Sequence, residues 1–288
     1  MKRSSYFIIA IPFITLAIIL TTLTVISHLS ADDSYSRLIT LSGDNVSRPI
    51  NGVNHLIIRS LKTDESTNRY INDPEIPVII TKSDSTPTIS GPEELIKLIS
   101  IEQTSDTTII EIDLKPTVAD VKPSARHRWF GIRSSEPLTV ALPSIPKSFY
   151  DPSNHLKLEI TKFNRGAIAL SYTDSIRFSD CRLDSVRFSI DNPDNVAYKY
   201  RSKNGYVNMN IDCINSHIRT LESINYHINY DFTHSTNSSI DIFNYTLPDS
   251  TVANLNCGNV NIKSFNCPPN GGAVNIRLNN GAKNLTIN

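Results

Sequence analysis

Apolar and polar residues alternate along most of the chain beyond residue 50, and many of the apolar ones are β-branched. A period of two with Val and Ile on one face predicts short β-strands. In this part of the chain only residues 91–95 favour a helix, because Pro92 suits a first helical position and two Glu suit the positive helix end. The predicted strands cover residues 55–61, 77–81, 98–102, 108–114, 138–142 and 155–160.

Residues 115–137 break this pattern, because they contain three prolines and show no clear alternation. Such a segment is typical of a loop. Strand signals resume after it, and from residue 155 onward the sequence consists of short apolar alternations separated by turn residues. The sequence therefore predicts an all-β fold with one long loop.

One stretch repeats outright, since residues 174–179 (DSIRFS) recur ten positions later as residues 184–189 (DSVRFS). A beat of five residues keeps apolar pairs on the inside only if the chain turns between them, as it does at the corners of a β-solenoid. An antiparallel meander with bulges is the alternative. The apolar pairs on this beat are Ile176/Phe178, Cys181/Leu183 and Val186/Phe188. Asn-rich alternations over 259–266, 273–280 and 283–288 favour stacking, because Asn can ladder with Asn in the next rung.

The chain begins with Lys2 and Arg3, followed by an uncharged apolar run from Tyr6 to Ser27. A helix of about 22 residues spans ~33 Å, the thickness of a bilayer core. The run is longer than the usual apolar region of a signal peptide, and the preceding charges keep the N-terminus inside. We expect residues 1–31 to be an uncleaved signal anchor or a cleaved signal peptide, with residues beyond about 32 extracytoplasmic. Residues 32–47 are then a linker and residues 48–288 the β-domain, with the loop 115–137.

The balance of charges and the spacing of the cysteines argue against two kinds of binding site, one for nucleic acid and one for a metal ion. Lys+Arg and Asp+Glu each number 28, and this balance argues against a nucleic-acid partner, which demands a basic surface. The four cysteines have no CxxC spacing, so no metal site is predicted. They are expected to be buried core residues or to form one or two disulfides. The cysteines are Cys181, Cys213, Cys257 and Cys267.

Several stretches together resemble the auto-transporter adhesin head GIN domain family. They are RPINGV (48–53), HLIIRS (55–60), the run PVIITKSDSTPTISGPEELIKLISIE (77–102) and TIIEIDL (108–114). The resemblance implies a bacterial envelope β-solenoid, right-handed and β-helix-like, and implies no common activity. This chain departs from the family in holding only 10 glycines.

No motif for catalysis is present, since GxSxG, HExxH, P-loop and GxGxxG patterns do not occur. The seven histidines are isolated, and we expect structural roles for them. Asp174, Asp180 and Asp184 form the densest group of carboxylates, as a glycoside-cleaving pair would require. They also fall at predicted corners, where Asp is common for turn reasons alone. No cofactor and no metal are predicted.

The segment 126–133 (RHRWFGIR) holds the only Trp of the chain. Aromatic and Arg side chains are enriched at binding hot spots, and Arg can grip a phosphate or carboxylate. Capping of an open solenoid end is the structural alternative. The predicted binding residues are Arg126, Arg128, Trp129, Phe130 and Arg133.

The sequence as a whole favours a non-enzymatic protein of the cell envelope. We expect it to be held at the membrane by its N-terminal helix and to present a β-solenoid for binding, adhesion or scaffolding. An envelope protein or a glycan is the expected partner. The two alternatives are an exported carbohydrate-active β-helix enzyme and a membrane-anchored envelope sensor or regulator.

Overall fold

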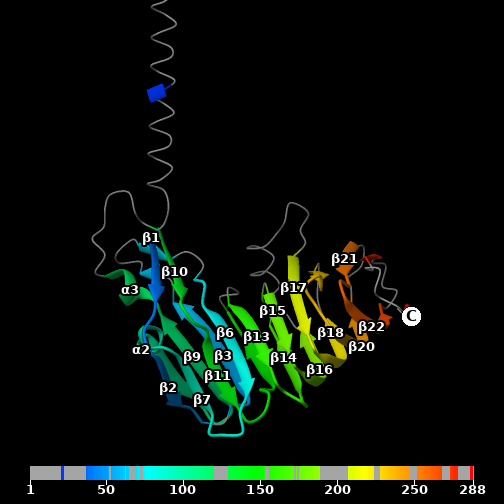
Figure 1. The fold of residues 1–288 in the computed structure, drawn as a ribbon, viewed down its shortest axis with the longest axis horizontal. Coiled ribbons are helices and arrows are strands. Elements are labelled where there is room, and N and C mark those ends of the chain that lie inside the picture. Colours follow the sequence, from blue (N-terminus) through cyan, green and yellow to red (C-terminus); the bar gives the residue numbers. More distant parts are fainter. Residues whose placement is uncertain are drawn as a thin grey trace, which may run out of the picture.

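The computed structural model describes residues 21–22, 37–51, 53–61, 63–64, 69–71, 74–119, 129–152, 156–171, 173, 175–188, 207–223, 228–246, 252–267, 273–277 and 286–287. Within them, most of the chain is β-strand, in one small sheet and two long open sheets (Figure 1). The all-β prediction is confirmed. The predicted N-terminal helix lies outside the described residues, apart from helical Thr21 and Thr22. In the part of the chain that is described, we find no helix long and apolar enough to span a bilayer.

The small sheet, sheet A, has the order β1-β10-β5-β4, and the two long sheets, B and C, have ten strands each. Sheet A comprises β1 (Arg37–Leu41), β4 (Thr63–Asp64), β5 (Arg69–Ile71) and β10 (Trp129–Ser134). Sheet B comprises β2 (Asn45–Pro49), β6 (Pro77–Lys82), β7 (Thr88–Pro92), β11 (Leu138–Leu142), β13 (Lys157–Thr161), β15 (Ser175–Ser179), β17 (Val207–Ile214), β19 (Ile228–Asp231), β21 (Val252–Asn256) and β23 (Ala273–Arg277). Sheet C comprises β3 (His55–Leu61), β8 (Ile99–Gln103), β9 (Thr107–Asp113), β12 (Ser148–Tyr150), β14 (Ala167–Leu170), β16 (Arg182–Phe188), β18 (His217–Ser223), β20 (Ser238–Tyr245), β22 (Val260–Asn266) and β24 (Thr286–Ile287).

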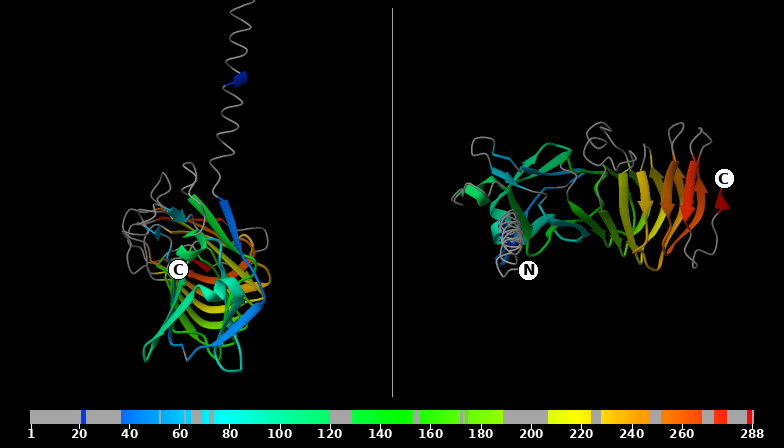
Figure 2. Two further views of the ribbon diagram at one scale, coloured as in Figure 1. Left: turned by 90° about the vertical axis from the view of Figure 1, so that its left-hand side faces the viewer. Right: turned by 90° about the horizontal axis from the view of Figure 1, so that it is seen from above.

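From β13 onward the chain alternates strictly between sheets B and C, and every pair that it makes is parallel. We call one strand of sheet B with the following strand of sheet C a rung. Colours change steadily from green to red along the stack, so rungs adjacent in sequence are adjacent in space (Figures 1 and 2). Equivalent residues of neighbouring rungs lie 22 positions apart at Asn244 and Asn266. The separation grows to 35 between Cys181 and Ser216, because residues 189–206 connect β16 to β17.

The N-terminal end of the stack is built differently. β2 and β7 are antiparallel, as are β8 and β9, and helix α2 (Glu93–Lys97) buries Leu95 and Ile96 against them. The predicted helical start is thus confirmed, although Pro92 is the N-cap residue and the last residue of β7. Antiparallel pairs and a helix therefore close this end of the apolar core.

The core lies between sheets B and C, where the inward residues of each strand are almost fully buried. At its C-terminal end, Phe243 packs edge-on against Phe265 with ring centroids 5.4 Å apart and against Tyr230 at 5.6 Å. The buried Tyr230 hydroxyl donates to Ser223 Oγ at 2.6 Å, which satisfies its hydrogen-bonding group. Contacts between aromatic rings thus continue from rung to rung, because each inward position faces its counterpart in the next strand.

The five-residue beat found in the sequence has two different structural origins. The first break is a true corner, because Asp180 has a φ of 53° and separates β15 of sheet B from β16 of sheet C. The second is a kink within β16, where backbone pairing with β18 lapses at Asp184, so that both Leu183 and Val186 point inward. The corner prediction is right for Asp180 and wrong for Asp184, because β16 continues past Asp184 in the same register with β18.

The corner at Asp180 is repeated in neighbouring rungs. Lys162, Asn215 and Asn237 also have left-handed backbone, with φ of 68°, 49° and 51°. Asn215 Nδ2 donates to Asp180 Oδ1 at 3.3 Å, and Asn237 Nδ2 donates to Asn215 Oδ1 at 3.1 Å. Asp and Asn tolerate this backbone better than most residues. The side-chain ladder therefore runs along one corner of the stack.

The predicted loop at 115–137 is partly wrong. It contains a short helix, α3 (Lys115–Ala119), and strand β10, which pairs in parallel with β1 and β5. The sequence does not indicate strand β10, because its alternating apolar residues that point inward are only two, Phe130 and Ile132, each about 1% exposed. Gly131 between them does not favour a strand.

Candidate functional site

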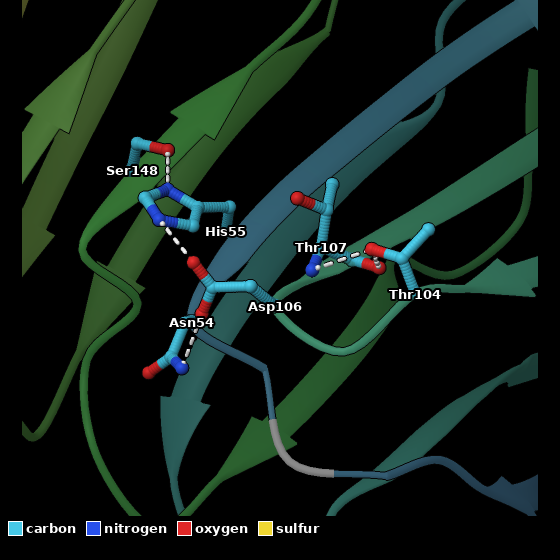
Figure 3. Close-up of polar contacts among 6 residues, drawn as sticks. All are labelled: Asn54, His55, Thr104, Asp106, Thr107 and Ser148. Atoms are coloured by element: carbon cyan, nitrogen blue, oxygen red, sulfur yellow. Dashed lines mark hydrogen bonds and ion pairs between the residues drawn. The ribbon is translucent and has the colours of Figure 1, made fainter.

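A Ser–His–Asp cluster lies where β3, β12 and the β8–β9 turn meet (Figure 3). His55 Nδ1 is 2.7 Å from Ser148 Oγ, and His55 Nε2 is 3.1 Å from Asp106 Oδ2. Asn54 Nδ2 donates to the other oxygen of Asp106 at 2.6 Å, and the turn is fixed by Thr107 N donating to Thr104 Oγ1 at 3.1 Å. Nucleophile, base and orienting carboxylate are therefore connected in one chain, the arrangement sought in hydrolases.

The same arrangement occurs a second time on sheet C, which changes its interpretation. His217 Nδ1 is 2.9 Å from Ser239 Oγ, and its Nε2 is 3.3 Å from Asp241 Oδ2. In both places the His and the Ser are direct partners in the parallel register, Ser148 with His55 and His217 with Ser239. Strand pairing alone brings these side chains together. We therefore interpret both clusters as side-chain hydrogen bonds that hold neighbouring strands together, not as catalytic sites.

This interpretation gives a first prediction. Ser148→Ala removes one partly exposed hydrogen bond and is expected to lower the free energy of unfolding by about 0.5–1.5 kcal/mol. Urea unfolding of the full chain in detergent, followed by circular dichroism, measures the loss, and Ser239→Ala should cost a similar amount. Covalent labelling of wild-type protein by a fluorophosphonate probe, abolished by Ser148→Ala, would instead identify Ser148 as an activated nucleophile.

A more promising site is a hollow of ≈ 290 Å³ on sheet B. Its volume is close to the lower limit of small-molecule sites, ~300 Å³. Residues of β6, β13, β15 and β17 line it, together with Pro137 ahead of β11. Its lining residues are Pro77, Val78, Ile79, Pro137, Lys157, Leu158, Glu159, Ser175, Arg177 and Asp212.

The charges of this hollow are balanced and held in place. Arg177 Nη2 contacts Asp212 Oδ2 at 3.0 Å, and the Asp212 carboxylate is largely covered while Arg177 is half exposed. Ser179 Oγ donates to Glu159 Oε1 at 2.7 Å. With Lys157, two cationic and two anionic side chains face the hollow beside the apolar Pro77 and Ile79. Such a mixture of fixed polar groups and apolar walls suits an uncharged polar ligand better than an ion.

The same face of sheet B continues into two columns of polar side chains. In the first, Asn229 Nδ2 donates to Asn208 Oδ1 at 2.8 Å, Asn254 Nδ2 to Asn229 Oδ1 at 3.3 Å, and Asn275 Nδ2 to Asn254 Oδ1 at 3.3 Å. The second column lies two residues further along each strand, and its members are Ser175, Asn210, Asp231, Asn256 and Arg277. The Asn stacking expected from the sequence for residues 273–280 is present here at Asn275.

The predicted binding segment 126–133 is only partly described. Arg126 and Arg128 lie outside the described residues, as does the side chain of Trp129, so their role stays a prediction. The Phe130 ring is buried in the core, while exposed Arg133 donates from Nε to Thr40 Oγ1 at 3.0 Å. The structure thus does not bring Phe130 and Arg133 to one surface.

The carboxylates considered for glycoside cleavage have other partners. Asp180 accepts from Asn215 in the corner ladder, and Asp184 Oδ2 accepts from the main-chain N–H of Gly166 at 3.0 Å. Asp174 lies outside the described residues. Among the residues that the structure describes, no group of His, Cys, Asp and Glu could hold a metal ion.

The four cysteines are free thiols. Cys181, Cys213 and Cys257 are buried, as the first of the two sequence interpretations predicted, while Cys267 is only partly buried. Burial raises the pKa of Cys181 and Cys257 to about 11 and that of Cys213 to about 12, from an ordinary 9.0. Nearby Asp212 and Cys181 add to the effect on Cys213. These thiols therefore stay protonated and unreactive at neutral pH.

A second prediction follows for alkaline solution. Below pH 9 the thiols are protonated in both states, so their burial stabilises the fold fully there. Above it the unfolded thiols ionise while the folded ones do not, so the free energy of unfolding should fall up to pH 11–12. Each thiol contributes up to about 1.4 kcal/mol per pH unit. Urea titrations at several pH values measure this slope, which Cys213→Ala should reduce and Cys267→Ala should alter less. An unchanged slope in Cys213→Ala would contradict the assignment.

Comparison with known protein families and with curated proteins gives no match. Solved structures with a remote likeness of fold include two from Parabacteroides. One, named "Putative lipid binding protein" from Parabacteroides distasonis, is 10% identical with a TM-score of 0.35 and covers 86% of this chain and 99% of its own. The other, "a putative adhesin" from Parabacteroides merdae, is 12% identical with a TM-score of 0.29 and covers 88% and 98%. Function must therefore be argued from this chain's own residues, and the GIN-family resemblance stays a prediction.

Proposed function

We propose that this chain is a non-enzymatic binding protein of the cell envelope and that the outer face of sheet B is its binding surface. The observation that carries the proposal is the hollow at Lys157, Glu159, Arg177 and Asp212, which continues into the polar columns of the same face. Polar groups held by their own ion pairs and hydrogen bonds are preorganised, so binding need not order them.

The proposal includes the solenoid architecture of the GIN-like family. Strict alternation between sheets B and C, parallel register throughout, and the repeated left-handed corner at Asp180, Asn215 and Asn237 support it. A right-handed coil is the sense expected for parallel strands joined by crossovers. Extended surfaces that run along the stack of repeats are what such folds use for binding.

The proposal also places the β-domain outside the cytoplasm, held by the apolar run Tyr6–Ser27. Protease treatment of intact cells, with opened cells as the control, tests this placement. Digestion of the β-domain from intact cells would place it on the surface and favour adhesion. Protection until the envelope is opened would favour a scaffold inside the envelope, and digestion only after cell lysis to the cytoplasm would contradict the proposal.

The hollow itself is tested by filling it. Ser175 lines the hollow, and Ser185 occupies the same place in the second copy of the sequence repeat but lies on sheet C. Ser175→Trp should abolish attachment of the full chain, carried in lipid nanodiscs, to isolated cell envelopes, while the matched Ser185→Trp should leave it intact. Equal attachment of both variants would exclude this hollow as the binding surface. Chain cleavage of envelope polysaccharides by the wild type would favour the enzymatic alternative.

A further inference from the structure

The asparagine column on sheet B offers the same chemical group at four successive rungs, from β17 to β23. Asn208, Asn229, Asn254 and Asn275 come from β17, β19, β21 and β23, which are neighbours in the sheet. Neighbouring strands lie about 4.7–4.9 Å apart, so the amides recur at that interval along the stack. Asn254 and Asn275 are exposed. A ligand lying along the column would meet a periodic surface.

The ladder fixes the direction of the Asn254 amide without using all of its hydrogen-bonding groups. Asn254 donates one N–H to Asn229 and accepts at Oδ1 from Asn275. An amide has two N–H groups and two oxygen lone pairs, so the ladder leaves one of each on Asn254. Because the ladder bonds hold the rotamers, little side-chain entropy is lost when a ligand binds.

The chemistry of the ligand follows from the lack of charge in this column. An anionic polymer would need a cationic surface, and a cationic polymer would need an anionic surface. Amide donors and acceptors in alternation match hydroxyl groups, which also donate and accept. A polymer that repeats hydroxyl groups at a spacing near that of β-strands is an extended chain of sugars. The second column is also nearly balanced, with Asp231 beside Asn256 and Arg277.

We propose that the outer face of sheet B binds a linear, uncharged polysaccharide that lies across the strands, along the two columns from the hollow toward β23. This inference rests on the proposed function and names the class of ligand. No aromatic side chain belongs to the two columns as described, so each sugar contributes little. Affinity therefore comes from repetition, as in other multivalent binding.

The test is calorimetric titration of the full chain in nanodiscs with uncharged glucan, mannan and galactan oligosaccharides of increasing length. For at least one series, affinity should rise with each added sugar and level off once the chain spans the columns. Binding should change little with salt, because no phosphate or carboxylate is neutralised. Equal affinity for a disaccharide and an octasaccharide, or no binding of any series, would overturn the inference.

Matched variants locate the site. Asn210 is exposed in the second column, and Asn261 is exposed on sheet C, so Asn210→Arg places a long side chain over the proposed surface and Asn261→Arg places it elsewhere. Asn210→Arg should weaken the longest oligosaccharide by about tenfold or more, and Asn261→Arg should not. If Asn210→Arg fails to fold, Asn275→Arg blocks the other end of the surface. Equal affinity of the folded variant and wild type would contradict the inference.

The outcomes separate this inference from the proposed function. Attachment to envelopes that Ser175→Trp abolishes, without binding of any uncharged oligosaccharide, would uphold the binding surface and reject the ligand class. Binding of charged polysaccharides alone, weakened by salt, would reject it as well.

Discussion

Phe243→Ala should destabilise the β-domain by about 3–5 kcal/mol, the usual cost of removing a fully buried aromatic ring. Phe243 is fully buried and its ring packs against those of Tyr230, Phe232, Tyr245 and Phe265. Its loss would leave a cavity shared by neighbouring rungs, and the β-strands around it cannot collapse without breaking their parallel register. Urea unfolding of the full chain in detergent, followed by circular dichroism, measures the effect.

The adjacent Ile242 provides the control, because it lies on the opposite side of the same strand and is 37% exposed. Ile242→Ala should change the free energy of unfolding by less than about 1 kcal/mol. Similar losses for the two variants would mean that the aromatic rings do not form the core of this part of the stack.

Gly258→Ala should cost about 2–5 kcal/mol, although it adds a single methyl group. The residue has a φ of 52°, where an ordinary side chain costs about 1–2 kcal/mol. A Cβ atom there would also lie 2.1 Å from the Phe232 carbonyl oxygen and 2.7 Å from Thr233 Cα. Relief of such a clash requires the main chain to move, which adds about 1–3 kcal/mol.

Gly91→Ala is the matched control for Gly258. Its nearest neighbours would be 3.6 Å from the added carbon, and its φ is not positive. Thermal unfolding of the two variants should therefore show a large decrease in melting temperature for Gly258→Ala and almost none for Gly91→Ala. A melting temperature of Gly258→Ala equal to that of the wild type would show that the corner there can relax freely.

Several of the β-strands could be predicted from the sequence, because inward apolar residues alternate with outward polar ones along them. Strands at 55–61, 77–82 and 138–142 are recovered almost to the residue. The strand order at the N-terminal end could not be predicted from the sequence. There β11 lies between β7 and β6, although β6 and β7 follow one another along the chain. Long-range pairing of this kind leaves no local signal.

The residues of the hollow on sheet B could not be predicted from the sequence as a group. Ser175, Arg177 and Asp212 form one surface only because β13, β15 and β17 stack in parallel register, with a long insertion between the last two. The Ser–His–Asp clusters were missed for the same reason, since His55 and Ser148 are 93 residues apart. Conversely, the composition of the segment 126–133 predicts a binding site, whereas its Phe130 belongs to the core.

Because the strands lie across the long axis of the stack, tension along that axis would load the hydrogen bonds of one rung at a time. Each rung would then peel from its neighbour in turn, and the remaining rungs would keep their pairing. The 22-residue separation between Asn244 and Asn266 sets the length released by that rung, roughly 70–80 Å of extended chain, and the 35-residue separation between Cys181 and Ser216 releases a longer piece. A protein of this design would yield to pulling gradually, by lengthening one rung at a time.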